Sequence, residues 1–114
     1  MQELLVRTTL LTFNDANLTS NYTVLHAKMS KPFRDQFPPD KLKSAFNDFS
    51  EKHIDIAYVA AMAPIPDKPA SINDDGVLTL EGHFETSPKK LKYNLGFIMS
   101  DGLWKPIRLN VDID

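Results

Sequence analysis

The sequence predicts an α+β domain in which N-terminal helices pack on one face of a curved, four-stranded antiparallel meander sheet. Apolar residues recur at helical spacing in the first half of the chain, and they alternate with polar residues at strand spacing in the second half. The chain has 114 residues, of which 42% are hydrophobic, a size suited to one compact core. We therefore predict a single domain that spans residues 1–114.

Four helical segments are predicted before the sheet, at about residues 3–18, 22–29, 33–37 and 39–52. The first has apolar residues on two opposite sides, which predicts burial on both: Val6, Leu10, Phe13 and Ala16 on one, Leu4, Leu11 and Leu18 on the other. Ser30 followed by Pro32 is typical of a helix start. The last helix carries one apolar stripe, made of Leu42, Ala45, Phe46 and Phe49.

Four strands are then predicted, at residues 54–62, 77–86, 89–100 and 103–113. In the first, Ile54, Ile56, Tyr58, Ala60 and Met62 share one face. Residues 63–76 hold three prolines and the run Asn73-Asp74-Asp75-Gly76, which indicates a long loop without regular structure. A turn at Ser87-Pro88 would place Gly82 beside Tyr93 and Phe84 beside Leu91.

The last two strands form a hairpin whose turn decides the register. A two-residue turn at Asp101-Gly102 would set Met99 against Trp104 and mix core with surface residues. A three-residue loop, residues 100–102, instead pairs Met99 with Leu103 and Leu95 with Ile107, and we predict this register. Gly102 then adopts the left-handed conformation. Pro106 makes the last strand a sheet edge or introduces a bulge there.

Composition excludes several partners and chemistries. The net charge of -2 comes from interspersed charges without a basic block, so we expect no nucleic-acid partner. The apolar runs are too short to span a membrane. Without cysteine there is no disulfide, thiolate nucleophile or zinc-thiolate site. We expect a periplasmic or secreted protein if a leader was removed, and a cytoplasmic protein otherwise.

The helical opening FNDANLTSNYTVLHAKMSKPFRDQFPPDKLKSAF, followed by strands and the closing DGLWKPIRLNVDI, resembles the nuclear transport factor 2-like superfamily. This superfamily shares its cone-shaped fold with ketosteroid isomerase, and the chain is most similar to its small exported bacterial members of unknown function. The resemblance covers nearly the whole chain. It implies a cavity between helices and sheet and frequent homodimers, and it does not imply one activity.

We predict no catalytic residues, no cofactor and no metal. The resemblance implies that enzymes of this kind use a carboxylate base in the cavity, but the polar inward strand positions here are Tyr58 and Tyr93. Both are interpreted first as core aromatics, and His26 as a partly buried, hydrogen-bonded histidine. If a ligand binds, its candidate contacts are Tyr22, His26, Phe33, Tyr58 and Tyr93. The predicted function is a non-catalytic, cavity-bearing domain that binds an apolar small molecule or a protein. The alternative is a small isomerase-like or hydratase-like enzyme that uses the cavity tyrosines and His26.

Two surface features of the sheet complete the predictions. Glu81, His83 and Glu85 alternate along one exposed face and could hold a metal weakly, but Lys90 and Lys92 opposite them favour ordinary charge pairing. Ile98, Trp104 and Pro106 meet on the outer face in the predicted register. We therefore predict a homodimer through the outer sheet surface near Trp104. The alternative is that a bulge at Pro106 turns Trp104 inward.

Overall fold

The computed structural model describes residues 2–52, 54–86 and 90–113, and it confirms an α+β fold in which helices precede an antiparallel sheet. The helices are α1 (Gln2–Thr19), α2 (Thr23–Lys28), α3 (Lys31–Gln36), α4 (Pro39–Ala45), α5 (Asn47–Glu51) and the short 3-10 helix η1 (Ala57–Ala61). The strands are β1 (Ile65–Pro66), β2 (Ser71–Ile72), β3 (Leu78–Phe84), β4 (Leu91–Ser100) and β5 (Leu103–Ile113). The predicted turn at Ser87-Pro88 lies outside the described residues.

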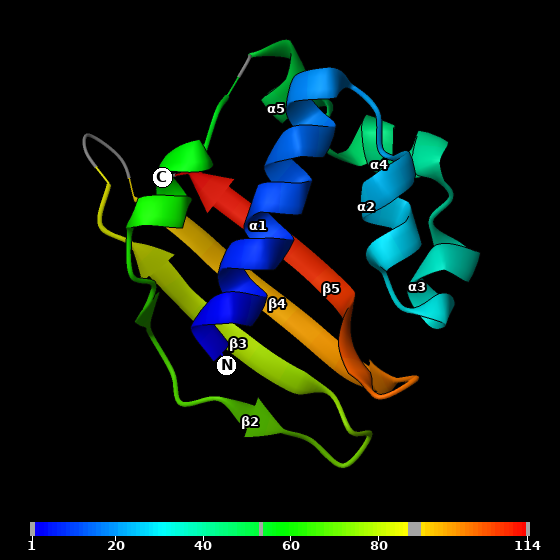
Figure 1. Ribbon diagram of the computed structural model, residues 1–114, viewed down its shortest axis with the longest axis vertical. Coiled ribbons are helices and arrows are strands. Elements are labelled where there is room, and N and C mark those ends of the chain that lie inside the picture. The colour runs from blue at the N-terminus through cyan, green and yellow to red at the C-terminus, as the bar shows by residue number, and fades with distance from the viewer. Residues whose placement is uncertain (1, 53, 87–89, 114) are drawn as a thin grey trace.

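The sheet is antiparallel throughout, in the order β1-β3-β4-β5, with β2 also paired to β3. Helix α1 lies across one face of the sheet, while α2, α3 and α4 lie beside the edge formed by β5 (Figure 1). The backbone N–H of Ser30 donates to the Pro106 carbonyl at 2.8 Å and ties the α2–α3 connection to that edge. The helical layer therefore meets the sheet both at its face and at the β5 edge.

Helix α1 confirms the predicted first helix, but only one of its two apolar sides is fully buried. Val6, Leu10, Phe13 and Ala16 are all in the core. On the other side, the prediction of burial was wrong for Leu4 and Leu18, which are 64% and 49% exposed. The helix therefore has one core face and a partly uncovered apolar face.

The strand predicted at residues 54–62 is wrong, because this segment forms an extended entry followed by η1. The buried Asn14 side chain of α1 accepts the Ile56 backbone N–H at 2.9 Å and donates to Asp55 Oδ1 at 2.9 Å. Asp55 Oδ1 also accepts the Ala57 N–H at 2.9 Å and so starts the helical turn. These bonds give the backbone polar groups partners on a helix and remove the need for a sheet neighbour.

The loop predicted at residues 63–76 contains two short strands, which correct the four-stranded meander. Strands β1 and β2 pair with β3, with Ile65 opposite His83 and Ser71 opposite Thr79. The Asp67 N–H donates to the Glu81 carbonyl at 2.9 Å between them. The free edge of β3 is therefore covered by two short pieces of this segment instead of by a strand at residues 54–62.

The predicted helix at residues 39–52 is interrupted at Phe46, which ends α4 and begins α5 with φ -109° and ψ 21°. Leu42 is buried as predicted, whereas Ala45 is exposed. The interruption lets two rings pack edge-on against Phe13, with ring centroids 4.8 Å away for Phe46 and 5.1 Å away for Phe49.

The predicted pairing of β3 with β4 is confirmed residue by residue. Gly82 lies opposite Tyr93, His83 opposite Lys92 and Phe84 opposite Leu91. Alternate residues of β3 are buried, because one face of this strand packs on the core.

The predicted three-residue loop between β4 and β5 is wrong. The turn is Asp101-Gly102, with Ser100 opposite Leu103 and Met99 opposite Trp104. Both turn residues have positive φ, 52° and 79°, as the mirror-image type I′ hairpin turn requires. Met99 and Leu103, predicted to face inward, are 55% and 64% exposed.

A register shift between Gly96 and Phe97 reconciles this turn with the core. Phe97 pairs with Pro106 and Gly96 with Arg108, so Ile107 is the extra residue of a bulge. Beyond the bulge Leu95 faces Leu109. Pro106 thus lies on an edge strand and beside a bulge, and both structural options predicted for it are present.

Gly102→Ala is expected to lower the free energy of unfolding by about 1 kcal/mol. Gly102 has φ +79°, and an added Cβ would contact nothing within 4 Å, so only the backbone conformation opposes a side chain. Urea denaturation of the two proteins measures the difference. An unchanged midpoint would show that the turn can reach another conformation at no cost.

Candidate functional site

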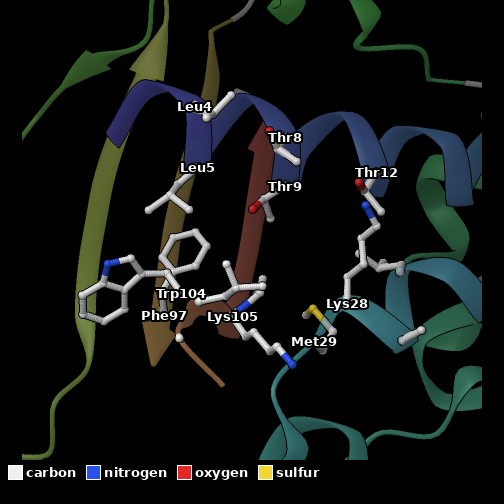
Figure 2. A pocket seen from close by; sticks show the side chains of 15 residues that line it. Leu4, Leu5, Thr8, Thr9, Thr12, Lys28, Met29, Phe97, Trp104 and Lys105 are labelled. Carbon is white, nitrogen blue, oxygen red and sulfur yellow. The ribbon is translucent and has the colours of Figure 1, made fainter. Parts of the chain in front are cut away.

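The largest of the hollows found on the described part of the chain is a cavity of about 560 Å³ between α1, the end of α2 and the β4–β5 hairpin (Figure 2). This volume is in the range of roughly 300–1,000 Å³ that is usual for small-molecule sites. Its wall is mostly apolar and consists of Leu4, Leu5, Thr8, Thr9, Thr12, Leu25, Ala27, Lys28, Met29, Phe97, Gly102, Leu103, Trp104, Lys105 and Pro106.

The hairpin bulge creates the floor of this cavity. Facing residues of an antiparallel pair share one side of the sheet, and Phe97, which is 1% exposed, faces Pro106. Trp104 lies two residues before Pro106 and therefore shares its side. The bulge has turned Trp104 toward the helices, which corrects its predicted place on the outer face and matches the alternative of an inward tryptophan.

Helix α1 supplies the roof. Leu4, Leu5, Thr8 and Thr12 lie three and four residues apart along one side of the helix, and all of them line the cavity. Figure 2 shows Leu5 pointing toward Phe97 and Trp104. Leu4 at the mouth is largely exposed, as is Leu103 on the hairpin. The opening thus has an apolar rim as well as an apolar interior.

The end of α2 forms the remaining wall and is held in place by backbone contacts. Arg34 Nη1 donates to the Met29 carbonyl at 2.6 Å, next to the bond between Ser30 and Pro106. A second hollow of about 370 Å³ lies between α1 and α2 and shares Thr12, Leu25 and Lys28 with the first. These three shared residues form the boundary between two adjoining hollows.

Charge in the main cavity comes only from lysine. Its wall includes no Asp, Glu or His among the residues that the structure describes. Lys105 lies 3.6 Å from Asp101, measured from Nζ to Oδ2, and is thereby partly neutralised. The Lys28 ammonium has no hydrogen-bond or ion-pair partner within the described ranges. The cavity is therefore electropositive at Lys28 although the whole chain carries a net charge of -2.

Tyr22, His26 and Phe33, three of the predicted ligand contacts, do not line this cavity. Tyr22 is buried and donates a hydrogen bond to Asn17 Oδ1, and burial raises the pKa of its hydroxyl. Nε2 of His26 lies 3.4 Å from the Arg34 carbonyl, outside the cavity wall. Phe33 is buried and packs on a neighbouring ring of α3. Their surroundings are those of structural residues.

Tyr58 and Tyr93 are also placed elsewhere. Tyr58 is on η1 and 39% exposed, and burial of part of the side chain raises its pKa. Tyr93 is buried in the core beneath β3, where burial raises its pKa to about 12. It borders two smaller hollows, neither of which includes Tyr58 or His26. The structure thus does not bring the predicted residues together in one site.

The outer face of the sheet carries a polar network. Arg108 donates to Asn94 Oδ1 and Thr79 Oγ1, each at 3.0 Å, and Asn94 donates to Glu81 at 2.7 Å. Lys68 Nζ lies 3.3 Å from Glu81. These contacts connect three strands and the segment before β2 across the surface.

His83 lies between two carboxylates on this face, 2.7 Å from Asp67 and 2.8 Å from Glu85. The predicted charge pair of Glu85 with Lys90 is present at 3.4 Å, and the hydrogen bond from His83 is the main cause of a lowered pKa at Glu85. In the described part of the chain, no three His, Cys, Asp or Glu residues are grouped to hold a metal ion. The alternating Glu81, His83 and Glu85 thus form hydrogen bonds and ion pairs with neighbouring side chains.

No family model, curated protein or solved structure matches this chain. Function must therefore be argued from the site itself. Among the described helices, none is both long and apolar enough to cross a membrane.

Sequence reasoning missed the cavity because most of its residues look like ordinary core or surface positions. The available signal was the pair of Leu4 and Leu5 with Thr8 and Thr12, a second semi-apolar stripe on α1 beside the core stripe. The floor depended on the hairpin register, which the sequence pattern gave incorrectly. The wall from α2 depended on where that helix docks.

Proposed function

We propose that this protein is a non-catalytic binding domain that holds an apolar small molecule in the cavity between α1 and the β4–β5 hairpin. The observation that carries the proposal is the cavity of about 560 Å³ with a mostly apolar wall and exposed leucines at its mouth. Burying a ligand there would remove apolar surface of both partners from water. A wall of aliphatic, aromatic, threonine and lysine side chains supports binding more than acid–base chemistry.

We also propose membership of the nuclear transport factor 2-like superfamily. The support is a long first helix laid across an antiparallel sheet, with an apolar cavity between the two (Figure 1). The homodimer through the outer sheet surface stays a prediction, but Trp104 no longer argues for it, because this residue faces the cavity.

The binding proposal is tested with the neutral probe 1-decanol. Trp104 is the single tryptophan of the chain and lines the cavity, so its fluorescence reports directly on occupancy. We expect saturable quenching or a spectral shift on titration. We also expect native mass spectrometry of protein from its own host to show a retained apolar molecule.

A cavity-filling variant makes the test specific. Thr8→Phe places a ring at the mouth and is expected to weaken 1-decanol binding about tenfold, since lost contact and strain of roughly 1.4 kcal/mol suffice. Thr23→Phe is the matched control, because Thr23 is exposed on α2 and lines none of these hollows. Absence of saturable binding to the wild type, or equal weakening by the two variants, would contradict the proposal.

A further inference from the structure

Lys28 lies where the apolar cavity meets the hollow between α1 and α2. Its side chain lines both spaces, as does Thr12. In Figure 2 the Lys28 chain extends toward Thr12, and its ammonium nitrogen is at the end nearest the threonine hydroxyl. A cation and a hydroxyl donor thus share the polar end of an otherwise apolar site.

This pair has capacity for a further partner. The Lys28 ammonium has three donors and makes no ion pair or hydrogen bond with another described residue. Asp15 borders the smaller hollow but forms no ion pair with Lys28 in the described structure. The other lysine of the wall, Lys105, already has Asp101 at 3.6 Å.

We infer that the ligand is an apolar molecule bearing one carboxylate, bound with the carboxylate at Lys28 and Thr12. Its apolar body lies against Leu5, Phe97 and Trp104. This inference rests on the proposed binding function and adds the chemical class of the ligand. The wall repels an organic cation, because its charged residues are lysines and no carboxylate faces the cavity among the residues described.

The number of donors favours a carboxylate over a phosphate. Phosphate sites commonly use arginine forks or several backbone N–H groups, and no arginine belongs to the described cavity wall. One lysine and one hydroxyl match the single charge and two oxygens of a carboxylate. The hydrophobic part of such a molecule then determines depth of insertion, and the carboxylate determines orientation.

Decanoate and 1-decanol test this inference, because they have equal chain length and differ in the head group. Binding is followed by Trp104 fluorescence and by isothermal titration calorimetry at neutral pH, below the concentration at which either probe aggregates. Wild-type protein is expected to bind decanoate about tenfold more tightly than 1-decanol, as a charge-assisted hydrogen bond provides.

Lys28→Gln is expected to weaken decanoate binding about tenfold and to change 1-decanol binding by less than about twofold. Lys41→Gln is the matched control, an exposed lysine on α4 that lines neither hollow, and it should keep the wild-type preference. The exposed position of Lys28 on the surface of α2 makes its substitution compatible with folding.

The outcomes separate the two proposals. Equal affinity of the wild type for both probes, an unchanged decanoate affinity in Lys28→Gln, or an equal loss in Lys41→Gln would overturn the carboxylate inference and leave the binding function standing. Failure of both probes to bind the wild type would overturn the binding function together with the inference.

Discussion

Phe13→Ala is expected to lower the free energy of unfolding by about 4 kcal/mol, in the range measured for phenylalanine removed from a core. Phe13 is 0% exposed and lies at the centre of α1. Phe46 and Phe49 contact its ring edge-on from both sides of the break between α4 and α5. Truncation would therefore leave a cavity and also remove the ring that holds two helices against a third.

Leu18→Ala is the control for this prediction. Leu18 is on the same helix and is 49% exposed, so its truncation is expected to cost less than about 1 kcal/mol. Urea denaturation followed by far-UV circular dichroism gives both values. A loss in Phe13→Ala no larger than that in Leu18→Ala would show that the aromatic cluster does not stabilise the helical layer.

The elements that local pattern alone specifies could be predicted. Helix α1 has an uninterrupted apolar stripe, and the pairing of β3 with β4 follows from two alternating strands joined by a short connection. In both cases the residues that decide the structure are neighbours in the sequence. The coarse α+β class follows from these elements.

The β4–β5 hairpin could not be predicted by a single register. The Asp101-Gly102 turn satisfies the local preference for positive φ at both positions. The core requires Leu95 to face Leu109, which is a different alignment. The extra residue Ile107 satisfies both requirements, and a prediction that applies one offset to the whole hairpin must violate one of them.

The segment at residues 54–62 has the alternation of a strand, yet tertiary contacts decide its conformation. Its decisive partner is Asn14, a buried polar residue some forty positions earlier, whose amide bonds to Asp55 and Ile56. Buried Ile56 and Val59 are three residues apart, which fits a 3-10 turn. No local pattern contains this long-range hydrogen bond.

The candidate site was the least predictable part because three separated segments form it. The prediction selected aromatic and histidine residues that the folded chain uses as core and capping contacts, such as Tyr22 against Asn17. The cavity instead combines leucines and threonines of α1 with Lys28 and Trp104. Each of these residues has an ordinary alternative role until the helix, the bulge and α2 are placed.

Gly82→Ala is expected to destabilise the protein by about 3 kcal/mol, at the upper end of typical overpacking costs. A Cβ on Gly82 would lie 2.4 Å from the Ile65 carbonyl oxygen and 2.5 Å from the Tyr93 hydroxyl oxygen. Ile65 is in β1, paired to β3, so its backbone cannot move without opening the sheet edge. The ring of Tyr93 occupies the space above this glycine and is itself buried.

Gly96→Ala provides the matched control on the neighbouring strand. Its Cβ would meet Arg108 at 3.1 Å, and that contact is with a flexible side chain on the outer face, so a change of less than about 1 kcal/mol is expected. Combining Gly82→Ala with Tyr93→Phe should recover only part of the loss, because the Ile65 carbonyl remains in the way. Chemical denaturation of the four proteins measures these differences. Equal stability of the two alanine variants would mean that β1 is not held against β3 as described, since only a mobile β1 could accept the new side chain.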